Sequence, residues 1–136
     1  FSGAYCATKA ALHSLSDAMR MELAPFGIEV ITIMPGAIES EFGNNAARSL
    51  ADTLPANSVY QPVKQHIAAR ANASQQNSTP TVGFVAAMVN TITQPHPPAE
   101  KRLGNGSTTL PLLKKLLPLA WVDKILQKKF GLNQPL

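Results

Sequence analysis

Cysteine, aromatic residues and charged residues are all scarce in this chain of 136 residues. The single cysteine, Cys6, excludes an intramolecular disulfide framework and leaves no Cys/His cluster with metal-ligand spacing. A reducing compartment suits such a chain best. Charged residues make up only 15% of the sequence and hydrophobic residues 45%, a balance that favours one globular domain over a disordered tail.

Long apolar runs and the marks of a secretory leader are also missing. No uninterrupted apolar run reaches the roughly 18–20 residues that span a bilayer, so we expect no transmembrane segment. The first residues, Phe1 to Tyr5, include no initiator Met and no signal-peptide pattern, so we expect the chain to begin inside a larger protein. These absences favour a cytoplasmic location, with an intracellular membrane surface as the alternative.

The basic charge is concentrated in one part of the chain. Twelve Lys and Arg residues against eight Asp and Glu give a net charge of +4, and seven of the basic residues lie between Lys101 and Lys129. Elsewhere basic residues are sparse and are not interleaved with aromatic residues, which disfavours a nucleic-acid surface. We therefore predict no nucleic-acid partner.

A helix followed by a buried strand is the first structural pattern. Ala4 to Ala24 combines good helix formers with apolar residues at intervals of three or four, and Pro25 and Gly27 end it. Ile28 to Met34 is short and β-branched, the profile of a strand buried on both faces of a sheet. Because a helix and a buried strand make half of a βαβ unit, we predict an α/β fold with a parallel sheet.

A long polar segment and a second helix come next. Residues 37–79 are mostly small and polar, which predicts a loop with short helices. Lids over active sites reach this length for a functional reason. Thr79 and Pro80 then predict the cap and the first residue of a helix that runs to about Thr93.

The last part of the chain has the patterns of an edge strand and of an amphipathic helical tail. Residues 101–106 predict a brief edge strand that leads into a glycine turn. Residues 110–130 predict a helix with an apolar stripe and lysines opposite, which Pro118 should kink or split. Such a helix is more often packed with a solvated face, and binding to an anionic membrane surface is the alternative.

Tyr5 and Lys9 are the candidate residues for acid/base catalysis. They stand four residues apart in the predicted helix, so their side chains share a face. A neutral phenol is a poor acid or base near neutral pH, and a neighbouring ammonium makes its phenolate easier to form. Such a phenol can protonate a carbonyl oxygen as hydride reaches the carbon, and its phenolate can take an alcohol proton in reverse. This spacing is common in helices, so the pair alone carries little weight.

The surrounding motifs make the pattern specific. Tyr5-Cys-Ala-Thr-Lys9 enters an amphipathic helix, and Leu23-Ala-Pro-Phe-Gly27, the strand Ile28 to Met34 and Pro35-Gly-Ala-Ile-Glu-Ser40 follow. This order resembles the short-chain dehydrogenase/reductase family over most of the first forty residues. The resemblance implies the C-terminal portion of a Rossmann-type doubly wound parallel sheet, followed by a helical tail.

The resemblance implies a single domain and assigns a structural role to each of its segments. Residues 1–40 would hold the catalytic helix, the strand and the nicotinamide-side turn, and residues 41–78 the substrate lid. Residues 79–109 would form the last helix and strand, and residues 110–136 the amphipathic tail. The family's Gly-rich phosphate-binding turn and its catalytic Ser and Asn have no counterpart, so we expect the nucleotide-binding half to be absent from this chain.

The resemblance implies an oxidoreductase that transfers hydride between NAD(P) and a carbonyl or secondary alcohol. Tyr5 would be the acid/base, and Lys9 would also hold the nicotinamide ribose hydroxyls. NADP is expected rather than NAD, although the residue that sorts the two has no counterpart here. The partner would be a small-molecule substrate, and the long N-terminal helix would pack in a homo-oligomer.

The nicotinamide-side turn, residues 35–40, would wrap the cofactor with four residues, Pro35, Gly36, Ile38 and Ser40. The backbone of Ile38 would contact the nicotinamide carboxamide. Ser40 stands where the family usually has Thr, and its hydroxyl can still form a hydrogen bond.

The substrate subgroup and two competing functions complete the expectations. The register around the strand most resembles members that act on lipid-like carbonyls, such as acyl-dihydroxyacetone-phosphate reductases and hydroxysteroid dehydrogenases. The first competing function is an inactive truncated piece of such an enzyme. The second is a module that binds a membrane surface or a protein through the basic tail.

Overall fold

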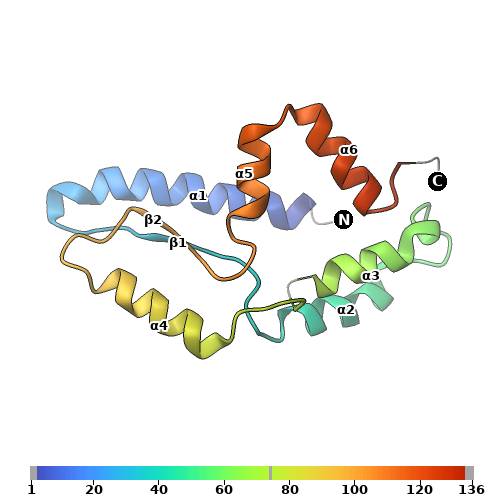
Figure 1. Ribbon diagram of the computed structural model, residues 1–136, viewed down its shortest axis with the longest axis horizontal. Coiled ribbons are helices and arrows are strands. Elements are labelled where there is room, and N and C mark those ends of the chain that lie inside the picture. The colour runs from blue at the N-terminus through green and yellow to red at the C-terminus, as the bar shows by residue number, and fades with distance from the viewer. Residues whose placement is uncertain (1–2, 74, 134–136) are drawn as a thin grey trace.

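A two-stranded parallel sheet and six helices make up the fold in the computed structural model, which describes residues 3–73 and 75–133. The helices are α1 (Gly3–Leu23), α2 (Phe42–Thr53), α3 (Lys64–Asn72), α4 (Thr81–Ile92), α5 (Thr109–Leu116) and α6 (Leu119–Lys129). Two single-turn helices and two strands complete the set: η1 (Ala24–Phe26), η2 (Gln61–Val63), β1 (Thr32–Pro35) and β2 (Glu100–Leu103). Figure 1 shows the strands between α1 and α4. The predicted α/β class with a parallel sheet is confirmed, and the full doubly wound sheet stays a prediction.

The strands β1 and β2 are neighbours in space but distant in sequence. Thr32 pairs with Glu100 and Pro35 with Leu103, in parallel register. Parallel neighbours need a crossover, and here the chain crosses through α2, α3 and α4. In the part of the chain that the structure describes, β1 has one neighbouring strand, so its second edge is unpaired.

The strand predicted from Ile28 to Met34 is longer than the observed strand, and the observed strand is less buried than predicted. β1 begins only at Thr32, and its first three residues are half-buried while Pro35 is exposed. The reason is the single neighbour: a strand is buried on both faces only when a wide sheet and helices cover it. The residues before Thr32 have no strand partner among those described and stay irregular.

The boundaries of α1 and α4 follow different causes. α1 ends as predicted, because Pro25 opens η1 and Gly27 takes φ 71° behind it. The predicted cap of α4 is wrong, since the N-cap residue is Pro80 and the helix begins at Thr81. Thr79 is engaged elsewhere: its N–H donates to the carbonyl of Ala37 at 2.8 Å, and Ile38 forms a bridge with it.

The tail splits where proline was expected to break it. Leu117 is extended between α5 and α6, and Pro118 stands at the N-cap of α6. Behind α6, Gly131 takes φ 67°, and a Cβ there would lie 2.6 Å from the imidazole of His66. The end of the tail therefore lies against α3, the second helix of the predicted lid.

Few of the described side chains are fully buried. Val63 and Val122 are 4% exposed and Thr91 is 3% exposed. Apolar side chains along α1 and α4 are exposed by contrast: Leu12, Leu15, Met19, Val82, Val85, Val89 and Ile92. The described chain therefore leaves apolar surface uncovered on both helices that flank the sheet.

Candidate active site

Tyr5 and Lys9 lie on the first turns of α1, on the same side. The Lys9 Nζ is 5.5 Å from the centroid of the Tyr5 ring, which places the ammonium over the ring. The Thr8 hydroxyl donates to the Tyr5 carbonyl at 2.8 Å. Because Tyr5 is 46% exposed, its phenol stays open to an incoming molecule. The structure thus brings together the two residues that spacing paired.

Phe42, the first residue of α2, is a neighbour of Tyr5 that sequence analysis missed. The two ring centroids are 5.7 Å apart and the ring planes are tilted by 46°, a favourable arrangement for aromatic rings. The available signal is an aromatic residue at the start of the lid, directly after the nicotinamide-side turn. Since Phe42 follows Ser40 by two residues, the contact brings the end of the turn close to Tyr5.

The turn begins in close contact with the chain after β2. Gly36 donates its N–H to the Leu103 carbonyl and Ala37 to the Asn105 carbonyl, both at 2.8 Å. A Cβ on Gly36 would lie 2.8 Å from the backbone nitrogen of Ser107 and still closer to the Asn105 carbonyl oxygen. Only glycine lets the two segments approach this closely.

The middle of the turn is joined to the far end of the lid. Glu39 donates its N–H to the Thr79 carbonyl at 3.0 Å, and the Thr81 hydroxyl donates to the Glu39 carbonyl at 2.6 Å. The half-buried Ile38 side chain faces Gly104, where a Cβ would lie 2.5 Å from its Cδ1. These contacts fix the backbone of the turn while its last residues, Glu39 and Ser40, remain exposed.

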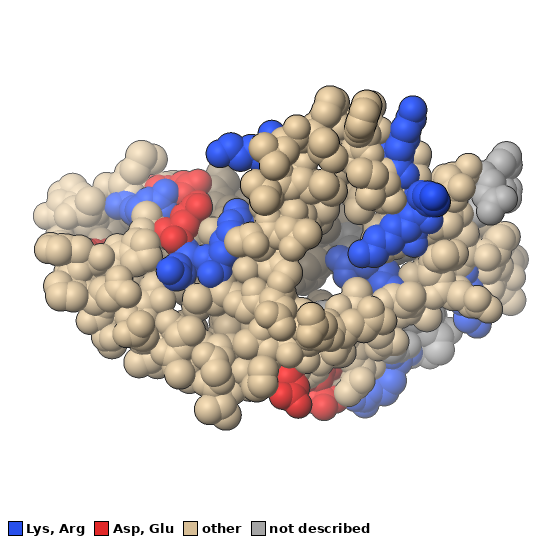
Figure 2. Space-filling view, in the orientation of Figure 1, with Lys and Arg blue, Asp and Glu red and all other residues tan. Residues whose placement is uncertain are grey.

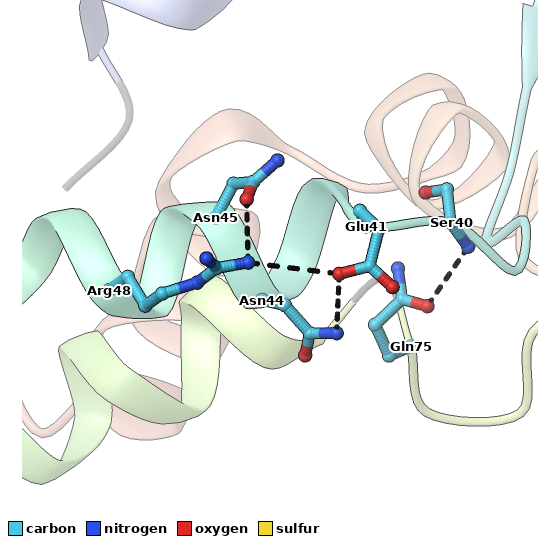
Figure 3. Close-up of polar contacts among 6 residues, drawn as sticks. All are labelled: Ser40, Glu41, Asn44, Asn45, Arg48 and Gln75. Carbon is cyan, nitrogen blue, oxygen red and sulfur yellow. Dashed lines mark hydrogen bonds and ion pairs between the residues drawn. The ribbon is translucent and has the colours of Figure 1, made fainter.

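A lid side chain, that of Gln75, reaches the backbone of Ile38 and Ser40. Ser40 donates its N–H to Gln75 Oε1 at 3.2 Å, as Figure 3 shows, and Gln75 Nε2 donates to the Ile38 carbonyl at 3.5 Å. The Ser40 hydroxyl also points to the Ile38 carbonyl, at 3.4 Å. Sequence analysis missed Gln75 because nothing in the polar run around it distinguishes it from Gln76.

Glu41 has a local structural role at the start of α2. Its Oε2 accepts from Asn44 Nδ2 at 3.0 Å and lies 3.8 Å from the Arg48 guanidinium (Figure 3). Its carbonyl accepts the N–H of Asn45 at 2.9 Å, the first bond of the helix. A carboxylate at a helix start is favourable because it faces the positive end of the helix dipole.

The groups of this site fit a nicotinamide cofactor. Lys9 offers three N–H donors for ribose hydroxyls, and Ser40 offers a hydroxyl. Ile38 offers a backbone carbonyl beside the exposed residue Glu39, and in the structure this carbonyl accepts from Gln75 Nε2. Pro35 ends β1, and Gly36 fixes the direction in which the turn leaves it.

Neither a metal-binding cluster nor a membrane-spanning helix is found in the part of the chain that the structure describes. Within residues 3–73 and 75–133, no three His, Cys, Asp or Glu side chains gather in a way that could hold a metal ion. None of the helices described there has both the length and the hydropathy for crossing a bilayer.

A cavity of about 440 Å³ lies beside Arg20, Gly27 and Ile31. It is near the opposite end of α1 from Tyr5, roughly 20 Å away by helix length, and is not part of this site.

Comparison with known proteins places the N-terminal part of the chain. Residues 1–51 match the family model described as short chain dehydrogenase. A short-chain dehydrogenase/reductase of Pestalotiopsis microspora is 31% identical over 96% of this chain and 49% of its own length. The NADPH-dependent 1-acyldihydroxyacetone phosphate reductase of Schizosaccharomyces pombe is 38% identical over 49% of this chain and 23% of its own. No solved structure matches the chain significantly.

A further relative matches over a shorter stretch. The 3-ketodihydrosphingosine reductase of Yarrowia lipolytica is 51% identical over 29% of this chain and 10% of its own length. The chain spans about half the length of the curated relatives that match nearly all of it. The segment matched by the family model holds every residue of the site from Tyr5 to Ser40. This chain therefore belongs to the short-chain dehydrogenase/reductase family.

Proposed function

We propose that this chain supplies the catalytic part of an NAD(P)-dependent oxidoreductase acting on a carbonyl or secondary alcohol. The observation that carries the proposal is the Lys9 ammonium 5.5 Å from the ring centroid of an exposed Tyr5, within the segment that matches the family model. The nicotinamide, when bound, supplies or accepts the hydride. The protein side chains then have to move one proton and hold two molecules in place.

Tyr5 Oη moves the proton. In reduction the phenol donates its proton to the carbonyl oxygen while the adjacent carbon receives hydride, and in oxidation the phenolate accepts the proton of the alcohol. The Lys9 ammonium stabilises the phenolate by its charge and holds the ribose hydroxyls. Phe42 restricts the Tyr5 ring, so the phenol meets the substrate in a limited range of orientations.

The nicotinamide-side turn holds the cofactor. The Ile38 backbone would hold the nicotinamide carboxamide, and the Ser40 hydroxyl would give a second hydrogen bond. The close packing of Gly36 against Asn105 supports this role, because it fixes the path of the turn that presents both residues.

The proposed cofactor is NADP, and the proposed substrate is a lipid-like carbonyl compound. Two relatives support this choice by their names, one an NADPH-dependent reductase of 1-acyldihydroxyacetone phosphate and the other a reductase of 3-ketodihydrosphingosine. An acyldihydroxyacetone phosphate is therefore the first substrate to assay.

The activity also needs a nucleotide-binding portion, which we propose to cover the surface that the described chain leaves open. The unpaired edge of β1 could pair with a strand of that portion, and exposed apolar residues such as Leu12 and Val82 could pack against it. The remaining exposed face of α1 would pack in a homo-oligomer. Alone, the chain is expected to be inactive.

The test compares two variants with matched controls in the polypeptide that joins this chain to its nucleotide-binding portion. Tyr5→Phe and Lys9→Met should each lower kcat by about 100-fold or more, the usual contribution of a proton-transfer group. The control Lys101→Met makes the same lysine change on β2, outside the lid. The control Tyr60→Phe makes the same tyrosine change within the lid, at a residue that is 45% exposed against 46% for Tyr5. NADPH absorbance reports turnover. Full turnover in the Tyr5 and Lys9 variants would reject the proposal.

A second candidate function, binding to an anionic membrane surface, is favoured by the tail. Figure 2 shows basic side chains over the α5 and α6 end of the molecule. Apolar side chains there are exposed as well: Leu112, Leu116, Leu119 and Trp121. Lysines beside exposed apolar residues are typical of helices that lie in a membrane interface.

Co-sedimentation with vesicles tests this second candidate. The protein should pellet with vesicles that contain phosphatidylserine and stay in solution with pure phosphatidylcholine vesicles. Trp121→Ala should weaken the binding, whereas Val82→Ala should not, although Val82 on α4 is 83% exposed against 64% for Trp121. Pelleting of the parent with neither vesicle type would leave the tail as a packed helix with a solvated face, and equal pelleting with both types would reject a preference for an anionic surface.

A further inference from the structure

The end of the lid is fixed beside the nicotinamide-side turn. Thr79 exchanges backbone hydrogen bonds with residues Ala37 and Glu39, at 2.8 and 3.0 Å. Asn105 donates its Nδ2 to the Asn77 carbonyl at 3.0 Å, and Asn77 takes φ 54°, in the left-handed region that suits asparagine. Because this segment is anchored, Gln75 is held within reach of the turn.

The Gln75 carboxamide spans two backbone groups of the turn. The Ser40 N–H can only donate and the Ile38 carbonyl can only accept, so Oε1 must face the first and Nε2 the second. The distances of 3.2 and 3.5 Å agree with this arrangement. A primary carboxamide thus rests on residues 38 and 40.

Nicotinamide carries the same chemical group. Its carboxamide also has one carbonyl oxygen and one NH2, and under the proposed function it binds this same turn. The Ile38 carbonyl has two lone pairs, and Gln75 Nε2 and the Ser40 hydroxyl already point to it, at 3.5 and 3.4 Å. A nicotinamide carboxamide that binds this carbonyl therefore has to displace one of the two, and because the Ser40 hydroxyl belongs to the proposed cofactor site, Gln75 is the group that leaves.

We propose that Gln75 is a latch that occupies the carboxamide-binding position of the turn and is displaced when the nicotinamide binds. This inference rests on the proposed function. Binding of the cofactor would release Gln75 from the turn, while the hydrogen bonds of Thr79 still hold the last residues of the lid. The part of the lid before Gln75 would then change position only when the nicotinamide ring has entered. The adenosine part of the cofactor, which lacks a carboxamide, would leave the latch in place.

The expected size of the effect follows from two modest hydrogen bonds. Both hydrogen bonds are long, at 3.2 and 3.5 Å, and such bonds are individually weak, so they should favour the latched state over the unlatched one by a factor of about five. A ligand that binds only the unlatched state has its apparent affinity reduced by the unlatched fraction. Removal of the latch should therefore tighten NADPH binding by about fivefold.

The test measures dissociation constants in the polypeptide that includes the nucleotide-binding portion. Gln75→Leu removes both hydrogen bonds at similar side-chain length, Gln75→Ala removes the side chain, and Gln76→Leu is the control next to it. Calorimetry would compare NADPH with 2′-phospho-ADP-ribose, which has no nicotinamide. Both Gln75 variants should bind NADPH about fivefold more tightly, with unchanged affinity for the analogue, and the control should match the parent.

The outcomes separate the latch from the function on which it depends. Unchanged or weaker NADPH binding in the Gln75 variants would overturn the latch. Equal tightening for both ligands would overturn it too, because the lid would then act on the whole cofactor and not on the carboxamide. If NADPH binds no more tightly than 2′-phospho-ADP-ribose to the folded parent and to both Gln75 variants, the nicotinamide adds nothing to binding and the proposed nicotinamide site itself is wrong. Circular dichroism would check that each variant is folded.

Discussion

Replacement of Gly36 by alanine tests the packing on which the candidate site is built. The new methyl group would lie 2.8 Å from the backbone nitrogen of Ser107 and 2.9 Å from the carbonyl carbon of Asn105. These are backbone atoms, so no side-chain rotation can relieve the clash. The segment after β2 must move away, and the hydrogen bond from Ala37 to Asn105 must lengthen or break.

The cost can be estimated from these two effects. Forcing a methyl group into a closely packed position typically costs about 1–3 kcal/mol, and the loss of a hydrogen bond adds about 0.5–1.5 kcal/mol. We therefore expect Gly36→Ala to lower the free energy of unfolding by about 2–4 kcal/mol. Urea unfolding followed by circular dichroism in the full polypeptide would measure it, at an unchanged slope against urea concentration.

Gly83→Ala is the matched control, because it adds the same methyl group in the first turn of α4. A Cβ on Gly83 would have no atom within 4 Å. Alanine is the better helix former, so this variant should be more stable than the parent by roughly 0.5–1 kcal/mol. The reasoning is refuted if Gly36→Ala unfolds within about 0.5 kcal/mol of the parent, the range of an ordinary surface substitution.

Three further changes probe the lid, the buried side chains and the tail. Phe42→Ala removes the ring beside Tyr5, and the pair is worth about 0.5–1.5 kcal/mol, so steady-state kinetics should show kcat/KM lower by roughly two- to tenfold. Val122→Ala should cost about 1.5–2 kcal/mol in urea unfolding because the side chain is 4% exposed, whereas Val59→Ala, at 73% exposed, should cost less than about 0.5 kcal/mol. Gly131→Ala forces a left-handed residue against an imidazole ring and should lower the unfolding free energy by about 1–2 kcal/mol, and an unchanged value would contradict that contact.

Local covalent constraints explain which parts of the fold were predictable. Pro25 and Gly27 end α1, and Pro118 divides the tail, because proline lacks an N–H and glycine tolerates positive φ wherever they occur. The helix periods and the glycine turn behind β2 are equally local. None of these features depends on the rest of the molecule, so the local sequence was enough to predict them.

The features that were predicted wrongly depend on distant segments. β1 is shorter than the β-branched run because a strand exists only where a neighbour pairs with it, and β2 pairs with Thr32 to Pro35 alone. Thr79 does not cap α4 because it pairs with the backbone of the turn instead. In both cases a tertiary contact overrode a valid local preference.

The residues of the candidate site fall into the same two groups, those fixed by local sequence and those that depend on distant contacts. Tyr5 and Lys9 were predictable because four residues of helix bring them together. Gln75 and Ser40 are 35 residues apart, and their contact follows from how the lid returns to the turn, which no periodicity records. Sequence analysis could name the lid as a segment but could not say which of its side chains reach the site.

Both ends of the lid converge on the nicotinamide-side turn, and this has a consequence for catalysis. Phe42 at its start touches the Tyr5 ring, and Gln75 at its end touches the Ile38 and Ser40 backbone. α2 and α3 pack against each other between these ends, so a displacement at Gln75 can be transmitted to Phe42 through two packed helices. If the nicotinamide displaces Gln75, the same event can change the surroundings of the phenol. Cofactor entry and proton transfer would then be coupled through the lid.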